Sequence, residues 1–278
     1  MHIDATTPLQ VPSHLVRRYL AAVMVIGTAL MATPAVTDLP IEPFILAMVF
    51  VPLLGGAVLT ARRSGPQGVR QLFSGVLRWR IGWRNWALAV VVMPLITLTV
   101  AAATGTLTAP TDGWLTTGID YLVATFLVGT LVVNLWEETA WQGLVQRHLT
   151  GRFGRGYGAL LTAVPFAVIH LPLGFVGGAT LREALVASIL VLVMAPPFRY
   201  LLGRTDHATG GSLLAVGVLH ASFNASGSLD VLVGGWQHIA GVAVVAGLAL
   251  LLDARRTAGR RMTIDAHLVH VDHLSIGR

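Results

Sequence analysis

The chain has 278 residues, of which 54% are hydrophobic and only 12% are charged. Soluble proteins average about 25% charged residues, so this composition excludes a soluble enzyme and indicates a polytopic membrane protein. The chain has no cysteine, which excludes disulfides, cysteine metal ligands and a cysteine nucleophile. Its net charge of +6 would suit nucleic-acid binding in a soluble protein. The positions of the arginines, described below, relate this charge to membrane topology instead.

Eight apolar stretches divide the sequence. Stretches of about 17–25 apolar residues are long enough to cross a bilayer as helices. In chain order they lie at residues 15–33, 41–61, 86–104, 118–146, 156–172, 183–202, 211–228 and 232–252. The sequence therefore predicts an all-α fold, a polytopic membrane protein with about eight transmembrane helices.

The arginines gather at one end of these predicted helices. The chain has no lysine, and of its 19 basic residues only Arg182 falls at the opposite end. Arg147 and Arg199 are assigned to the links that follow the fourth and the sixth stretch. Because cytoplasmic loops carry the excess of positive charge, the pattern predicts a plasma-membrane protein with an even number of helices and both termini in the cytoplasm.

Residues 65–86 differ from the predicted spans. Their apolar side chains form a helical stripe with arginines off it, which predicts an amphipathic helix lying at the membrane interface. The chain is accordingly divided into four parts. These are N-terminal transmembrane helices (1–60), a basic amphipathic linker (61–85), an intramembrane core of six helices (86–252) and a basic cytoplasmic tail (253–278).

Two adjacent glutamates, Glu137 and Glu138, lie inside the predicted span 118–146. A carboxylate at the centre of a membrane helix costs about 2.5–3.5 kcal/mol on insertion scales. Two neighbouring carboxylates also disfavour each other's ionisation. An ionisable pair at this depth is therefore interpreted as a functional site.

Few other strongly polar side chains lie within the spans, and among them are His170, His220 and Asn224. His220 and Asn224 are four residues apart, so they share one helix face. At about 1.5 Å of rise per residue, Glu137 and His220 each lie about 15 Å from a helix end. We expect these side chains to meet in one polar cavity near the middle of the bilayer.

This set of side chains suits hydrolysis of an amide at membrane depth. A carboxylate and an imidazole that hold one water form a general-base pair. A second histidine and an asparagine can donate hydrogen bonds to the developing oxyanion. Taken singly, each side chain also has a structural interpretation. Polar residues such as Asn224 commonly join membrane helices by hydrogen bonds, and a tryptophan such as Trp141 more often packs than recognises substrate.

Three ordered motifs resemble those of the CPBP family, the CAAX prenyl proteases and bacteriocin-processing proteins that are also called Abi proteins. The family's Glu-Glu-x-x-x-Arg motif corresponds to residues 137–142. Its Phe-x-x-x-His motif is matched by Phe166 and His170, and its His-x-x-x-Asn motif by His220 and Asn224. The resemblance implies a CAAX-protease-like helical bundle.

The resemblance also implies a function, that of a glutamate-dependent intramembrane endopeptidase. In that family the first glutamate, here Glu137, activates water together with the histidine at His170. The family's residues at the positions of His220 and Asn224 are assigned to stabilising the oxyanion. The glutamate at the position of Glu138 supports the site.

The substrate implied by the resemblance is a membrane-embedded or lipidated peptide or protein, reached from within the lipid bilayer, and not a nucleic acid. Substrate contacts are expected from Trp141, Gln142 and Phe166. Gln142 stands where the family usually has arginine, and glutamine carries no charge. No cofactor is expected. An older view of the family as metalloproteases leaves zinc as the alternative, although the chain has no His-Glu-x-x-His motif.

Two other functions stay open from the sequence. A catalytically impaired immunity or scaffold protein of the same fold would explain Gln142 as a sign of decay, and it predicts that Glu137→Ala leaves the phenotype intact. A proton-coupled transporter would also place glutamate and histidine in the membrane. A transporter is expected to show inverted repeats with broken helices at matching positions, and the prolines of this chain show no such pairing.

Overall fold

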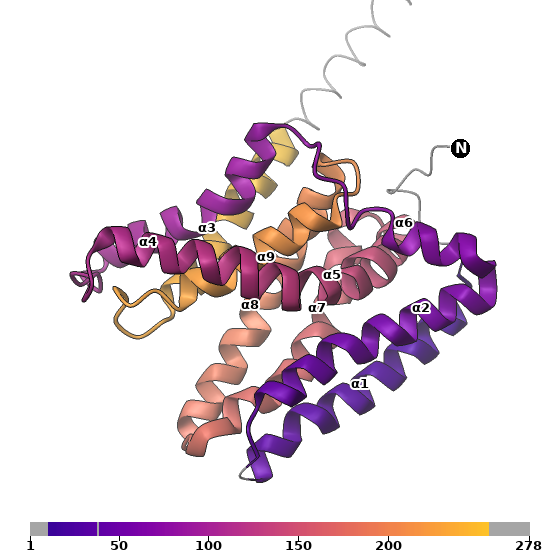
Figure 1. The fold of residues 1–278 in the computed structure, drawn as a ribbon, viewed down its shortest axis with the longest axis horizontal. Coiled ribbons are helices and arrows are strands. Elements are labelled where there is room, and N and C mark those ends of the chain that lie inside the picture. Colours follow the sequence, from indigo (N-terminus) through magenta and orange to yellow (C-terminus); the bar gives the residue numbers. More distant parts are fainter. Residues whose placement is uncertain (1–10, 38, 256–278) are drawn as a thin grey trace, which may run out of the picture.

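The computed structural model describes residues 11–37 and 39–255. This part of the chain is an all-α bundle (Figure 1), with no strand beyond an isolated bridge between Leu107 and Leu232. The helices are α1 (Ser13–Val36), α2 (Glu42–Phe73), α3 (Trp83–Ala103), α4 (Trp114–Val123), η1 (Ala124–Asn134), α5 (Leu135–Ala140), η2 (Trp141–Gln146), α6 (Arg147–Phe153), α7 (Arg155–His170), η3 (Leu171–Gly178), α8 (Leu181–Ala208), α9 (Leu213–Gly227) and a last helix over Gln237–Arg255.

The predicted membrane fold is confirmed, with one change in the length of a span. Seven helices in the described residues are long and apolar enough to cross a membrane; among them are the continuous runs Trp114–Phe153 and Arg155–Gly178. The stretch predicted at 211–228 is the 15-residue helix α9. At 1.5 Å per residue it is about 22 Å long, shorter than a hydrocarbon core of about 30 Å. Almost all of its side chains are buried, so neighbouring helices shield it from lipid.

The predicted amphipathic linker is shorter than expected. Helix α2 continues beyond residue 61, breaks at Gly65 (φ 59°, ψ −154°) and resumes as far as Phe73. That backbone conformation is open essentially to glycine alone. Leu72 and Val76 are buried, whereas Trp79 and Trp83 are exposed. The interfacial location stays a prediction, and the predicted tail beyond Arg255 lies outside the described residues.

Helix α9 occupies the centre of the bundle and packs against η1, α3 and α5. Figure 1 shows α1 and α2 as an antiparallel pair on one side, with α4, η1 and α5 running as one long rod past α9. Two glycines allow the close approach. A β-carbon at Gly217 would lie 2.9 Å from the Cα of Leu135, and one at Gly129 would lie 2.7 Å from the Cβ of Ala221. The histidine of α9 is thereby brought next to the glutamates of α5.

The glutamates lie on a short α-helical segment between two π-helical segments. Helix α5 has six residues, and η1 precedes it while η2 follows it. In η1 the Thr130 hydroxyl donates to the carbonyl of Thr125, five residues earlier, at 2.6 Å. π-Helical turns are rare and occur frequently at functional sites. The apolar pattern of residues 118–146 did not predict this change of helix type.

Candidate active site

The two glutamates have opposite surroundings, and Glu138 is the fully bonded one. Its carboxylate accepts hydrogen bonds from Nη1 of Arg199 at 2.8 and 2.9 Å. It also accepts one from Nδ1 of His220 at 2.9 Å. Glu138 and Arg199 are both completely buried. Breaking a buried ion pair of this kind leaves an uncompensated charge, so Arg199 and His220 together fix the position of the Glu138 carboxylate.

Arg199 was assigned to a loop from the sequence, and that assignment is wrong. Helix α8 continues to Ala208, so Arg199 lies nine residues before its end and its side chain is completely buried. Its Nε donates to Gln146 at 2.8 Å, and the guanidinium lies over the ring of Phe166, 5.3 Å from the centroid. The loss of hydration is offset by these partners. A charge within an otherwise apolar span was the signal available in the sequence.

Gln142 connects this ion pair to a second one. Its side-chain oxygen accepts from Nη2 of Arg199 at 3.3 Å, while its nitrogen donates to Asp206 at 3.1 Å. An amide can both donate and accept, whereas an arginine can only donate. Glutamine at this position therefore fits the presence of Arg199 on the neighbouring helix.

The second ion pair joins Arg147 and Asp206. Arg147 donates from Nε and Nη2 to the two carboxylate oxygens at 3.0 and 2.6 Å. Its Nη2 also donates to the carbonyl of Gly211 at 3.1 Å. Arg147 is only 5% exposed, so this residue too is not in a solvated loop as predicted. Neither this pair nor Arg199 was identified as part of the site from the sequence, because each partner lies on a different span.

Glu137 has no such partners. Its Oε1 is buried and accepts no hydrogen bond from the described residues. Two imidazole nitrogens lie beyond hydrogen-bond distance: Nε2 of His170 is 3.7 Å from Oε1, and Nδ1 of His220 is 4.0 Å from Oε2. A buried polar atom without a partner requires an explanation, and a separation above 3.5 Å suits a bridging water.

The backbone of α7 orients the ring of His170. Its Nδ1 lies 2.6 Å from the carbonyl oxygen of Phe166. Because a carbonyl only accepts hydrogen bonds, Nδ1 carries the proton, and in the neutral ring Nε2 presents its lone pair towards Glu137. The ring of Phe166 packs 4.5 Å from that of His170, centroid to centroid. Two acceptors thus face the same small space.

His220 is held from the other side. Its Nδ1 donates to Glu138, and its ring packs edge-on against Phe198 with centroids 4.8 Å apart. A protonated His220 has a second N–H, on Nε2, to donate elsewhere.

Asn224 contacts a residue that the sequence analysis did not single out. Its amide nitrogen lies 3.5 Å from the side-chain oxygen of Asn134. Asn134 is buried, and its own amide nitrogen has no partner among the described residues. Asn134 lies one helical turn before Glu137, as Asn224 lies one turn after His220. Four of the five predicted catalytic side chains therefore lie together (Glu137, Glu138, His170 and His220), while Asn224 contacts Asn134.

The three predicted substrate-binding side chains, Trp141, Gln142 and Phe166, are at most 2% exposed. The rings of Trp141 and Phe166 pack edge-to-face, 5.6 Å apart. This burial favours a role in positioning the site, and contact with substrate stays a prediction.

The residues around Glu137 do not fit a zinc ion. In the described part of the chain no three His, Asp or Glu side chains are arranged to hold a metal. The carboxylate of Glu138 is committed to Arg199, and a guanidinium at that position repels a divalent cation.

Residues 119–226 match the family model described as type II CAAX prenyl endopeptidase Rce1-like. This segment is similar to the CAAX prenyl endopeptidases. The resemblance inferred from the three motifs is thus confirmed, and the matched segment contains every residue of the candidate site as well as Arg199 and Asp206. No curated protein matches the chain. The seven helices of the described residues that are long and apolar enough to cross a membrane, together with this similarity, indicate an integral membrane protein.

Proposed function

We propose that this protein is an intramembrane endopeptidase that hydrolyses a peptide bond with water activated by Glu137 and His170. The observation that carries the proposal is the contrast between the two glutamates. Glu138 is saturated by Arg199 and His220, whereas Glu137 has a free carboxylate oxygen 3.7 Å from the lone pair of His170. One glutamate is thereby structural and the other is available for chemistry.

Two facing acceptors are suited to activating a water. A water between them donates one hydrogen to the Glu137 carboxylate and the other to Nε2 of His170. As its oxygen attacks the carbonyl carbon, one proton passes to this pair. The proton then goes to the leaving amine as the C–N bond breaks, which returns the pair to its starting state.

The negative charge on the carbonyl oxygen requires donors on the opposite side. His220, held by Glu138 through Nδ1, donates from Nε2 in its protonated form. The amide nitrogens of Asn224 and Asn134 are the next donors along the two helices. Removing one such donor typically costs about 10²–10³ in rate.

Arg199 supports the enzyme interpretation over that of a decayed scaffold. The family's usual arginine is replaced by Gln142, but the positive charge next to Glu138 is present and comes from α8. The buried charge network around Glu138 is therefore intact.

The expected substrate is a membrane-embedded or lipidated peptide, because the site lies within the spanning helices and the matching family model is named for CAAX prenyl endopeptidases. The location proposed is the plasma membrane, with both termini in the cytoplasm, from the distribution of arginines.

The proposal is tested with purified protein and a library of transmembrane and lipidated peptides. We expect cleavage by the wild-type protein, loss of cleavage in Glu137→Gln, and no effect of a chelator. Asp120→Asn, an equal change at an exposed carboxylate of α4, serves as the matched control. Unchanged cleavage in Glu137→Gln contradicts the mechanism. Cleavage that a chelator abolishes and zinc restores revives the metalloenzyme. A wild-type protein that cleaves nothing favours the scaffold.

A further inference from the structure

A cavity of about 440 Å³ lies beside the candidate active site. We refer to it as the arginine pocket. Gln142 and Gln146 form its inner wall, and its other walls come from α6, α7, α8 and the last helix. None of its lining residues is aliphatic, although the chain is 54% hydrophobic. The outer walls comprise Arg147, Thr150, Gly151, Arg155, Tyr200, Gly203, Arg204, Asp206, His207 and Asp253.

The arginine pocket lies at the ends of four spans. The run Trp114–Phe153 ends there and the run Arg155–Gly178 begins there; α8 and the last helix also end close by, at Ala208 and Arg255. The polar ends of spanning helices lie at the depth of the lipid headgroups. The same end carries the excess of arginines, so the pocket is placed on the predicted cytoplasmic side.

Two ion pairs border the arginine pocket. Arg147 is paired with Asp206, and Arg204 lies 3.4 Å from Asp253, which also accepts from the Tyr200 hydroxyl at 2.8 Å. These two carboxylates therefore neutralise two of the three arginines.

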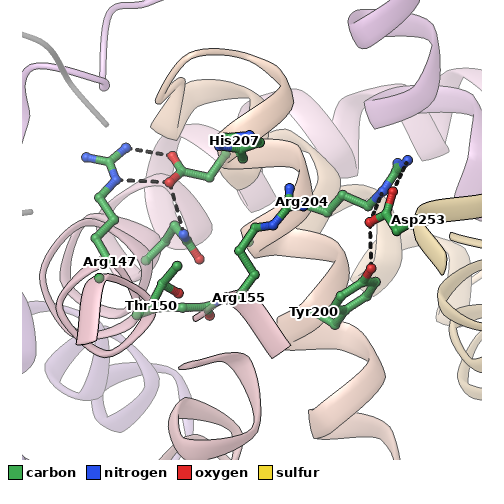
Figure 2. Close-up of a pocket in the computed structure, with 12 residues that line it drawn as sticks. Arg147, Thr150, Arg155, Tyr200, Arg204, His207 and Asp253 are labelled. Atoms are coloured by element: carbon green, nitrogen blue, oxygen red, sulfur yellow. Dashed lines mark hydrogen bonds and ion pairs between the residues drawn. The ribbon is translucent and has the colours of Figure 1, made fainter. Parts of the chain in front are cut away.

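Arg155 is the third arginine. Its side chain reaches across the middle of the pocket towards Arg204 (Figure 2) and makes no hydrogen bond or ion pair to a described residue. The Thr150 hydroxyl and the His207 ring also line the pocket and donate to no described side chain. Arg155 is exposed and its charge also acts on Asp253. With three arginines and two aspartates, the pocket carries a net positive charge and at least two further donors.

We propose that the arginine pocket binds the phosphate of an anionic phospholipid headgroup. A guanidinium accompanied by hydroxyl and imidazole donors suits phosphate oxygens, and 440 Å³ is within the range of small-ligand sites. A phospholipid is favoured over a soluble phosphate because the pocket opens where four spans end. Basic pockets between spanning helices on the cytoplasmic side are a recurring form of headgroup site. The proposal does not depend on peptidase activity.

The test measures lipid retention by the full-length protein, using native mass spectrometry after titration with phosphatidylglycerol or phosphatidylcholine. We expect preference for phosphatidylglycerol, and affinity about tenfold lower in Arg155→Gln, the effect of losing one charge-assisted hydrogen bond. Arg63→Gln removes an exposed arginine of α2 outside the pocket and should bind as the wild type does. Thr150→Val, which keeps the volume, should weaken binding less than Arg155→Gln.

Three results would overturn the proposal. The first is equal retention of phosphatidylglycerol by the wild type and Arg155→Gln. The second is binding of inorganic phosphate, lost in Arg155→Gln, with no lipid preference, which would identify a soluble phosphate compound as the ligand. The third is a raised KM for a cleaved peptide in Arg155→Gln with lipid retention unchanged, which would assign the pocket to the substrate. Loss of cleavage in Glu137→Gln concerns the peptidase proposal alone and leaves lipid binding as it was.

Discussion

Arg199 on α8 holds Glu138 on α5 through a single guanidinium nitrogen that lies 2.8 and 2.9 Å from the two carboxylate oxygens. The pair is completely buried, and Gln146 and Gln142 occupy the remaining nitrogens of the guanidinium. This relationship explains how the site retains a positive charge although Gln142 replaces the family's arginine.

Removing the Arg199 charge is expected to destabilise the fold. Arg199→Gln leaves the carboxylate of Glu138 buried without its cation, which costs about 3–5 kcal/mol of unfolding free energy. The measurement is thermal or denaturant unfolding in detergent. Arg204→Gln is the matched control, since its partly exposed pair with Asp253 at 3.4 Å is worth about 0–1 kcal/mol. Equal stability of the two variants would mean that the Glu138–Arg199 pair does not hold the site.

Moving the charge from α8 to α5 tests whether Gln142 and Arg199 belong together. Gln142→Arg alone places a second cation near Arg199 and removes the acceptor for its Nη2, so it should lower both stability and cleavage. The double variant Gln142→Arg/Arg199→Gln keeps one charge within reach of Glu138, because residues 138 and 142 share a helix face. We expect the double variant to recover part of the stability and part of the cleavage that Arg199→Gln loses. Higher activity in Gln142→Arg alone would instead support a decayed site.

The two histidines are expected to differ in their effects. His170 makes one side-chain hydrogen bond, to a backbone carbonyl, and is partly exposed, so His170→Ala should lower the cleavage rate by about 10²–10⁴ with little change in stability. His220 is buried and bonded to Glu138, so His220→Ala should lower both the cleavage rate and the stability. Cleavage rates and unfolding midpoints measured on the same preparations check this. Full activity of His170→Ala would remove it from the water-activating pair.

The amide pair on η1 and α9 tests the assignment of the oxyanion. Asn224→Ala is expected to lower kcat by about 10²–10³ with KM nearly unchanged, as for other oxyanion donors. Asn134→Ala should resemble it if the buried amide of Asn134 donates directly. If Asn134→Ala instead changes only the unfolding midpoint, the role of Asn134 is confined to holding Asn224 in place.

The close approach of α9 to α5 depends on Gly217. A β-carbon there would lie 2.9 Å from the backbone of Leu135, so Gly217→Val must push the helices apart. Overpacking of this kind costs about 1–3 kcal/mol, and the shift should also reduce cleavage by moving His220 from Glu138. Gly156→Ala in α7 has open space around it and should leave activity unchanged while stabilising the helix by up to about 1 kcal/mol. A fully active Gly217→Val would show that this spacing is not required.

Much of this protein can be derived from its sequence, since lipid imposes simple requirements on a chain. The apolar stretches predicted the all-α membrane fold because backbone groups in hydrocarbon must be bonded within helices. The cost of a charge at that depth identified Glu137 and Glu138, and the spacings within the three motifs indicated the family. Each of these inferences uses neighbouring residues along the chain.

The tertiary structure decided which glutamate is free and which is bound. That difference depends on Arg199, which is 61 residues from Glu138 in sequence and was taken for a loop residue. It depends equally on Asp206, which lies 64 residues from Gln142 and makes the glutamine a bridge between two ion pairs. Sequence periodicity specifies the face of a helix but not the partner that the face meets. The division of roles between Glu137 and Glu138 therefore became visible only once α5, α8 and α9 were packed together.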